Sequence, residues 1–393
     1  TNFEQRKKAE SQEDLVVQFA FDNPPFIPDF RLTNLRLAED KYPVATADYF
    51  ANDIYYKIEY AATVLDDSQT LLCLRVGAKN ESDKIKQIMI RSKIGYYSEN
   101  KMFDYHYIPY RWTNEKWKDY DQVVLKEHSI YKGQQLIGEV VSENMNLFWE
   151  EKKSYTDKEY EDILYPQVWY GSGYVTPEFR VKDMHRVVCA MKEVQPNDSA
   201  FFVLKLLVND SLITSFHEES LKQLTFKDVK EKAIADFKVP FTDKTLKTEF
   251  KRDEWEDLFC SLQLSTLQLL VNDFQNKMYQ PAQGGSSERF FVWVFEAVQM
   301  LRPMLRTGQF ESVKKSLDYI FSLQDAGFPP VGKFTTTSGA IGTTGPRWAN
   351  TTGMALALAC DYYLYSKDQQ FMEDYLSKIL KAVHWILGEI KAT

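Results

Sequence analysis

Apolar and polar residues alternate with a period of two over most of the chain from residue 15 to residue 220. The clearest runs are 54–63, 70–76, 85–90, 136–141 and 201–208, and clusters of Asp, Asn, Ser and Pro separate them. Such alternation buries one face of each run and is typical of antiparallel strands. The pattern predicts a β-sandwich over 15–220, with a hairpin formed by 56–64 and 70–79, after a flexible lead-in at 1–14.

Beyond residue 220 the spacing of apolar residues changes to that of a helix. A linking helix is predicted at 221–237, followed by a connection to residue 252 that contains Pro240. Residues 253–393 then carry helical spacing throughout, apart from a loop at 325–347 that is rich in Gly, Thr and Pro. We expect this loop to be ordered by Phe328, Phe334, Ile341 and Trp348. The predicted helices of this part are 253–279, 289–306, 309–324, 348–365 and 369–390.

Composition and charge narrow the classes of ligand. The net charge is −8 and the pI is about 5.4, which argues against nucleic acid as the main partner and suits a neutral ligand. The sequence contains no run of 18 apolar residues, which is about the length that a helix needs to span a membrane. Aromatic residues make up 15% of the chain. Such rings stack on sugars, but they also fill the cores of β-sandwiches.

Motifs for metal or cofactor chemistry are missing from the sequence. The five histidines are dispersed without HxH or HExxH spacing, and no GxSxG, GxGxxG or Walker A motif occurs. We therefore expect neither a metal site nor a cofactor. The aromatic segment 103–120 (FDYHYIPYRWTNEKWKDY) is either a sugar-stacking platform or an edge that packs on the helical domain.

Three segments of the helical part share features with a known superfamily. Segment 286–297 (SSERFFVWVFEA) enters a helix with an aromatic pattern, and 317–330 (LDYIFSLQDAGFPP) ends a helix with Gln, an acidic residue, Gly and Pro. In 348–386 a Trp opens a helix, and a Lys-Asp turn joins it to the next. With the order sandwich, linking helix, antiparallel helices, these segments resemble the six-hairpin (α/α toroid) glycosidases, which are glucoamylase-like or disaccharide-phosphorylase-like.

The resemblance implies an α+β multidomain fold with an antiparallel β-sandwich and a partial (α/α)6 toroid. It also implies a carbohydrate-active protein, foremost a glycoside hydrolase that acts on an oligosaccharide or polysaccharide. Aligned on Trp293, the chain has Phe295 and Glu296 where the superfamily has an Arg-Asp pair that contacts sugar hydroxyls. The substrate-binding residues that we expect to share one concave surface are Trp293, Glu296, Phe334, Arg347, Trp348 and Asn350. Glu296 could instead pair with Arg289 or Arg302 on the surface.

The catalytic residues implied by the resemblance fall beyond residue 393. A twelve-helix toroid needs on the order of 250 residues, more than follow residue 252. Hydrolysis of glycosides needs two opposed carboxylates, so we expect this chain alone not to hydrolyse them. The uncovered half toroid would be covered by self-association or by a further C-terminal part. Because the chain begins with Thr1, we expect a trimmed leader and a periplasmic or extracellular location.

Two other functions remain open at this stage. One is a catalytically inert carbohydrate-binding or assembly protein on the same scaffold. The other is a lyase or an unsaturated-uronide hydrolase on a related toroid. The sequence identifies neither the sugar nor the stereochemical course.

Overall fold

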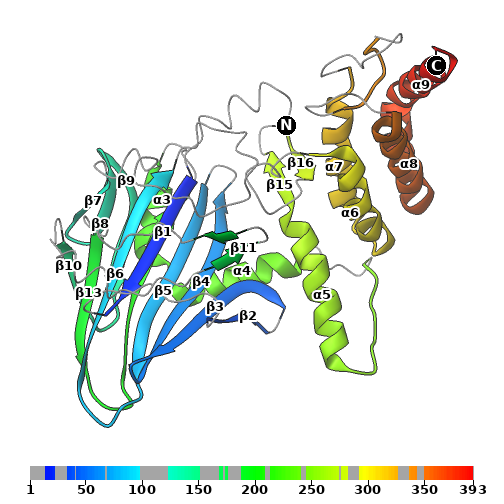
Figure 1. Cartoon of the computed structure of the whole chain (residues 1–393). Coiled ribbons are helices and arrows are strands. Elements are labelled where there is room, and N and C mark those ends of the chain that lie inside the picture. Colours follow the sequence, from blue (N-terminus) through cyan, green and yellow to red (C-terminus); the bar gives the residue numbers. More distant parts are fainter. Residues whose placement is uncertain are drawn as a thin grey trace. The chain divides into compact units, whose positions relative to one another are not determined.

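The structure is a computed structural model that describes residues 14–22, 33–39, 41–66, 69–97, 123–150, 168–170, 173–175, 187–208, 213–239, 245–273, 276–281, 292–325, 336–342 and 349–392. These residues form two compact units, which meet in the sequence between Phe237 and Lys238. The first unit contains the large antiparallel sheets and the second is mainly helical (Figure 1). The predicted α+β class, with sheets followed by helices, is confirmed, whereas the closure of the helices into a toroid stays a prediction.

Two antiparallel sheets make up most of the first unit. Their strand orders are β1-β6-β13-β10 and β2-β3-β4-β5-β14-β9-β8-β7, and β11 pairs with β12 in a separate hairpin. The strands are β1 (Asp14–Phe21), β2 (Asn34–Ala38), β3 (Tyr42–Ala51), β4 (Ile54–Asp66), β5 (Gln69–Asn80), β6 (Lys86–Tyr97), β7 (Val123–Lys126), β8 (Ser129–Lys132), β9 (Gln135–Ser142), β10 (Asn146–Glu150), β11 (Val168–Tyr170), β12 (Gly173–Val175), β13 (Val187–Val194) and β14 (Ser199–Leu207). All five predicted runs are strands, and β4 and β5 form the predicted hairpin.

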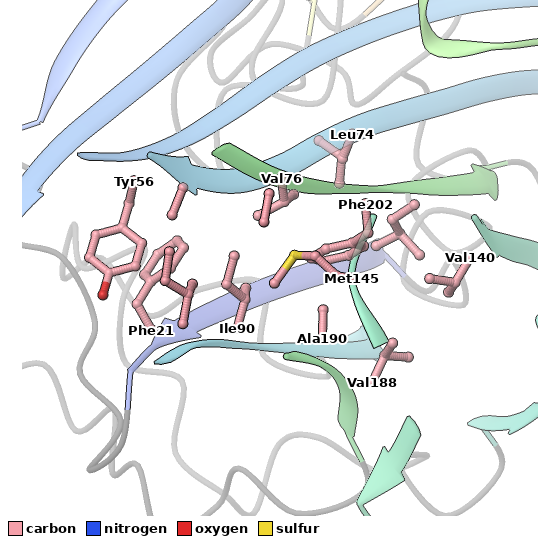
Figure 2. Packing of buried hydrophobic residues seen from close by; sticks show 14 of the residues in the cluster. Phe21, Tyr56, Leu74, Val76, Ile90, Val140, Met145, Val188, Ala190 and Phe202 are labelled. Carbon is pink, nitrogen blue, oxygen red and sulfur yellow. The ribbon is translucent and has the colours of Figure 1, made fainter. Parts of the chain in front are cut away.

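The core of this unit lies between the two sheets, as expected for a sandwich. Ile90 and Ala190 of the small sheet face Val76 and Phe202 of the large sheet, and Met145 lies among them (Figure 2). All five side chains are buried. Because alternate residues of each strand point to the same face, this layer accounts for the period of two in the sequence.

The large sheet is also covered on part of its second face. Helices α3 (Ser215–Gln223) and α4 (Phe226–Lys238) contribute Leu221 and Val229 to a second apolar cluster, in which they meet Leu71, Cys73 and Val203 of β5 and β14. Strands buried on both faces are expected to read as nearly continuous apolar runs. This is why β5 and β14 carry the sequences TLLCLRV and FFVLKLL.

A buried lysine joins the sheet to the end of α3. Lys205 of β14 is 3% exposed, and its Nζ lies 2.7 Å from a carboxylate oxygen of Glu139 on β9. The same Nζ donates to the carbonyl oxygens of Leu221 and Leu224, where α3 ends. Burial raises the pKa of the neighbouring Cys73 thiol to about 12, so this thiol is neutral at pH 7. Glu139 is therefore the anionic partner of Lys205.

The predicted single helix at 221–237 is wrong. The chain forms two helices here, α3 and α4, which Leu224 and Thr225 separate. Thr225 caps α4, since its Oγ1 accepts the backbone N–H of Asp228 at 3.2 Å. The Asp228 carboxylate accepts the backbone N–H of Thr225 at 2.9 Å in return. This reciprocal capping box satisfies backbone donors that a continuous helix would satisfy internally. A second box, between Thr214 and His217, begins α3.

The second unit consists mainly of helices, with one small hairpin. Its elements are α5 (Asp253–Gln268), β15 (Leu270–Asp273), β16 (Met278–Pro281), α6 (Val294–Arg306), α7 (Phe310–Ser322), α8 (Ala349–Ser366) and α9 (Gln369–Ala392). The predicted helix at 253–279 is therefore wrong beyond Gln268. Asn272, Asp273 and Asn276 favour turns over helix, and Lys277 adopts φ = 54° in the hairpin between β15 and β16. The other four predicted helices match α6 to α9.

The predicted Lys-Asp turn between α8 and α9 is confirmed and is tied to α7. Lys367 has φ = 58°, and Asp368 caps α9 by accepting the backbone N–H of Phe371 at 3.0 Å. The other carboxylate oxygen of Asp368 accepts from Lys314 Nζ of α7 at 2.8 Å and from the Tyr362 hydroxyl of α8 at 2.9 Å. One carboxylate thus connects three helices.

We expect Asp368→Ala to lower the free energy of unfolding of the helical unit by about 1–2 kcal/mol at pH 7, because an N-cap is lost. The hydrogen bond from Lys314, then that from the Phe371 amide, hold the pKa of Asp368 below its usual value. The stabilisation is therefore complete above the unfolded pKa of about 4 and is lost as the pH falls through the folded pKa.

Amide hydrogen exchange of α9 at pH 7, and urea unfolding at pH 7 and pH 3, would measure this loss. Asp374→Ala is the matched control, because Asp374 is a carboxylate of the same helix that accepts only from the Gln370 amide among the hydrogen bonds described. A penalty for Asp368→Ala that is as large at pH 3 as at pH 7 would contradict the assigned role.

Candidate functional site

The helices of the second unit alternate in direction, which brings the starts of α6 and α8 to one end. The turn of Thr307 to Gln309 joins α6 to α7 as an antiparallel hairpin. Lys314, near the start of α7, bonds Asp368 beyond the end of α8. At the opposite end Gln324, just after α7, pairs with Ile341, which bonds the first turn of α8. We call this end, with residues 293–296, 324–325, 336–342 and 349–352, the loop end.

Aromatic and acidic side chains are exposed where α6 enters the loop end. Trp293 occupies the N-cap position and is 40% exposed, Phe295 is 41% exposed, and Glu296 in the first turn is also exposed. The opposite side of the same helix is buried through Val294, Ala297, Val298 and Leu301. Because a helix that buries one stripe presents the other to water, the sequence of α6 itself fixes which of these side chains are accessible.

A short ordered segment lies across the loop end. The backbone N–H of Ile341 donates to Thr352 Oγ1 at 3.1 Å, and this hydroxyl donates to the Ile341 carbonyl at 3.2 Å. Ile341 is fully buried, as are Ala340 and Thr352. Ile341 was one of the apolar residues expected to order the loop, and its burial agrees with that expectation. The segment is thereby attached to the first turn of α8.

Helix α9 holds the same segment from the other side. Trp385 is 2% exposed, and its Nε1 donates to the Thr336 carbonyl at 2.9 Å. Gly339 adopts φ = 103°, and a Cβ on this residue would lie 2.3 Å from the Lys381 carbonyl oxygen. Only glycine allows so close an approach with this backbone conformation. Asp325 adds an ion pair with Lys381 and accepts the Gly339 amide.

The start of α8 contributes polar groups to the loop end. Asn350 is exposed, and its side-chain oxygen accepts the backbone N–H of Thr351 at 2.8 Å. Backbone N–H groups in the first turn of a helix lack partners within the helix and carry the positive end of its dipole. The starts of α6 and α8 can therefore donate hydrogen bonds to hydroxyl or carbonyl oxygens of a ligand.

Three of the six expected binding residues are thus described, and all three lie at the loop end. Trp293, Glu296 and Asn350 are exposed there. Phe334, Arg347 and Trp348 lie outside the described residues, as does the aromatic segment 103–120, so their roles stay predictions. Arg302, considered as a partner of Glu296, instead donates to Asp361 of α8 at 2.9 Å.

Sequence reasoning treated Phe295 only as a departure from the superfamily pattern. It noted Gln324 and Asp325 only as part of a motif at the end of a helix, and it missed Lys381. Gln324 donates to the Lys378 carbonyl at 2.8 Å and so fixes α9 beside the loop end. The available signal was the Gly339 turn, since a glycine in a segment with buried apolar residues marks close contact between backbones.

In the described part of the chain, no three His, Cys, Asp or Glu side chains converge as a metal site would require.

Neither a protein-family model nor a curated protein matches this chain. Among solved structures, the chain is similar to a family GH92 alpha-mannosidase from Bacteroides thetaiotaomicron, with a TM-score of 0.27 and 11% sequence identity. The match covers 92% of this chain and 48% of the mannosidase chain. The chain therefore spans about half the length of that structure. Within the described residues, no helix is both long and apolar enough to cross a membrane.

Proposed function

We propose that this chain is a carbohydrate-active protein and that it binds a neutral oligosaccharide at the loop end. The observation that carries the proposal is the exposed pair of rings, Trp293 and Phe295, beside the exposed carboxylate of Glu296. An exposed aromatic ring offers an apolar face on which a sugar ring stacks. A carboxylate accepts hydrogen bonds from sugar hydroxyls.

Two further features support a neutral sugar as the ligand. The chain carries a net charge of −8, which disfavours polyanionic ligands. The segment 336–342 is held by hydrogen bonds to α8 and α9, so this part of the loop end is formed before a ligand arrives. Preformed sites lose less conformational entropy on binding.

The finer proposal is that the sugar is a substrate of a glycoside hydrolase, and it rests on the sequence resemblance to six-hairpin glycosidases. The alternative is an inert carbohydrate-binding protein. The replacement of the Arg-Asp pair by Phe295 and Glu296 favours this alternative, because it removes a guanidinium that would hold sugar hydroxyls. Both forms of the proposal require binding at the loop end, which is the property that can be tested first.

We expect Trp293→Ala to weaken oligosaccharide binding by roughly 5–30-fold, because the stacking surface is lost. Isothermal titration of the full chain with gluco-, manno- and xylo-oligosaccharides would provide the dissociation constants. Trp255→Ala is the matched control, since Trp255 is an exposed indole on α5 (54%). Equal affinities for the wild type and Trp293→Ala, or no binding to any of these sugars, would refute the proposal.

A further inference from the structure

Helix α9 carries an exposed apolar stripe along its outer side. Successive members of the stripe are four, three, four and three residues apart. Three leucines and one isoleucine of the stripe are between 47% and 64% exposed, and the valine at its centre is partly exposed. The members are Leu376, Leu380, Val383, Leu387 and Ile390. Large apolar side chains that form a contiguous exposed row mark an interaction surface more often than single ones do.

The opposite side of α9 is already covered within the helical unit. Phe371 and Ala382 are fully buried in its core, and Tyr375 and Ile379 pack against that core. Figure 1 shows α9 as the last helix of the described array. A helix that is apolar on two sides is suited to burial on both. Among the residues that the structure describes, the packing of α9 on its own unit therefore does not account for the stripe.

The spacing of the stripe indicates that its partner is another helix. Alternating steps of three and four residues form the seam by which two helices pack side by side. The stripe is also nearly symmetric about its centre. In an antiparallel pair of identical helices, Val383 would meet its own copy, Leu380 would meet Leu387, and Leu376 would meet Ile390.

The charges at the two ends of the stripe fit the same arrangement. Glu373 and Asp374 lie at its N-terminal end, and Lys391 lies at its C-terminal end; all three are exposed. Antiparallel pairing brings the two carboxylates of one copy next to the lysine of the other. Parallel pairing would bring like charges together at both ends, which is unfavourable.

We propose that α9 is a docking surface for a second copy of this chain, with the two α9 helices antiparallel about Val383. An isologous contact of this kind closes on itself and produces a two-fold dimer. The proposal is independent of carbohydrate binding, because the stripe and its end charges do not include the residues assigned to the sugar.

The test is sedimentation velocity of the full chain between about 1 and 100 µM, with a matched pair of double variants. Leu380→Lys/Leu387→Lys places two charges in the seam and is expected to weaken dimerisation by at least about 100-fold. Leu258→Lys/Leu262→Lys changes two leucines of α5 that lie four residues apart and have similar exposure, 49% and 59%. This control is expected to dimerise like the wild type. Circular dichroism would verify that both variants remain folded.

Charge reversal separates the proposed pairing from unspecific apolar contact. Lys391→Glu is expected to weaken the dimer, and the added change Glu373→Lys is expected to restore it in part. A wild-type chain that remains monomeric at about 100 µM would overturn the proposal, whether the stripe is free or covered by another partner. A dimer that resists Leu380→Lys/Leu387→Lys, or that the α5 control disrupts equally, would also overturn it.

Discussion

Replacing Lys205 by methionine is expected to lower the free energy of unfolding of the sheet unit by about 3–5 kcal/mol, the usual effect of breaking a buried ion pair by removing one partner. Methionine has a similar volume, so packing is nearly preserved. The ammonium group, however, is the partner of Glu139 at 2.7 Å and donates to the carbonyls of Leu221 and Leu224. Its loss leaves a largely buried carboxylate without its cation.

Amide hydrogen exchange of β14 and α3 in the full chain would measure this effect within the sheet unit alone. Lys79→Met is the matched control on the same sheet, because its pair with Glu81 is 43% and 37% exposed and is expected to contribute less than about 1 kcal/mol. The double variant Lys205→Met/Glu139→Gln removes the stranded charge and is expected to recover part of the loss. If this double variant is as unstable as Lys205→Met, the ion pair is not the cause.

Trp385→Ala is expected to destabilise the helical unit by about 3–5 kcal/mol and to release the segment 336–342 from α9. The indole is almost fully buried. Trp385 also lies against Gly339 at the point where the backbone of segment 336–342 contacts α9. Its Nε1 also donates to Thr336. Because this segment lies across the loop end, the variant should weaken sugar binding as well, although Trp385 itself faces the interior.

Comparison with Trp385→Phe separates packing from the hydrogen bond, since phenylalanine keeps most of the apolar contact and is expected to lose about 1–2 kcal/mol. Thermal unfolding and hydrogen exchange of α9 provide the readout. Trp255→Ala, which truncates an indole that is 54% exposed, should change stability little. A Trp385→Ala chain as stable as this control would show that the indole is not part of the core.

The alternation of apolar residues was sufficient to predict five runs that are strands, β4, β5, β6, β9 and β14, because each of these strands has one face on the sandwich core. It could not show what covers the second face of β5 and β14. Lys205 illustrates this limit, since in the sequence it is only a polar break within FFVLKLL. Its burial depends on the carbonyls at the end of α3, which approach it only in three dimensions. Contacts between distant segments are invisible to local periodicity.

The two errors in helix prediction have local causes that were present in the sequence. Thr225 and Asp228 form a capping box inside an otherwise helical apolar pattern, so the helix breaks where the pattern continues. After Gln268 the spacing of Leu269 and Leu270 still suits a helix, but the Asn and Asp residues that follow favour the turn of a hairpin. At Thr225 the hydrogen bonds between side chain and backbone prevailed over apolar spacing.

For the candidate site, the sequence indicated Trp293, Glu296 and Asn350 but not the supports around them. The antiparallel order of α6, α7 and α8 brings two helix starts together, and the resemblance to the six-hairpin glycosidases had implied antiparallel helices. The attachment of segment 336–342 depends on Gly339 and Trp385, which are far apart in the sequence. Such a contact requires the fold to be known.

The strand order of the large sheet has a consequence for how the chain folds. Central strand β5 pairs along its length with β14, so that Leu71 lies opposite Leu207. Its partner on the other side, β4, is the adjacent strand in the sequence. Strands β5 and β14 are separated in the sequence by eight other strands, and pairing between such distant segments is slow. Helical hairpins such as α6 with α7 form from neighbouring residues and are faster. During synthesis on the ribosome, one hydrogen-bonding edge of β5 must therefore stay unpaired until β14 emerges, and chaperones that bind exposed apolar strands should act on this interval.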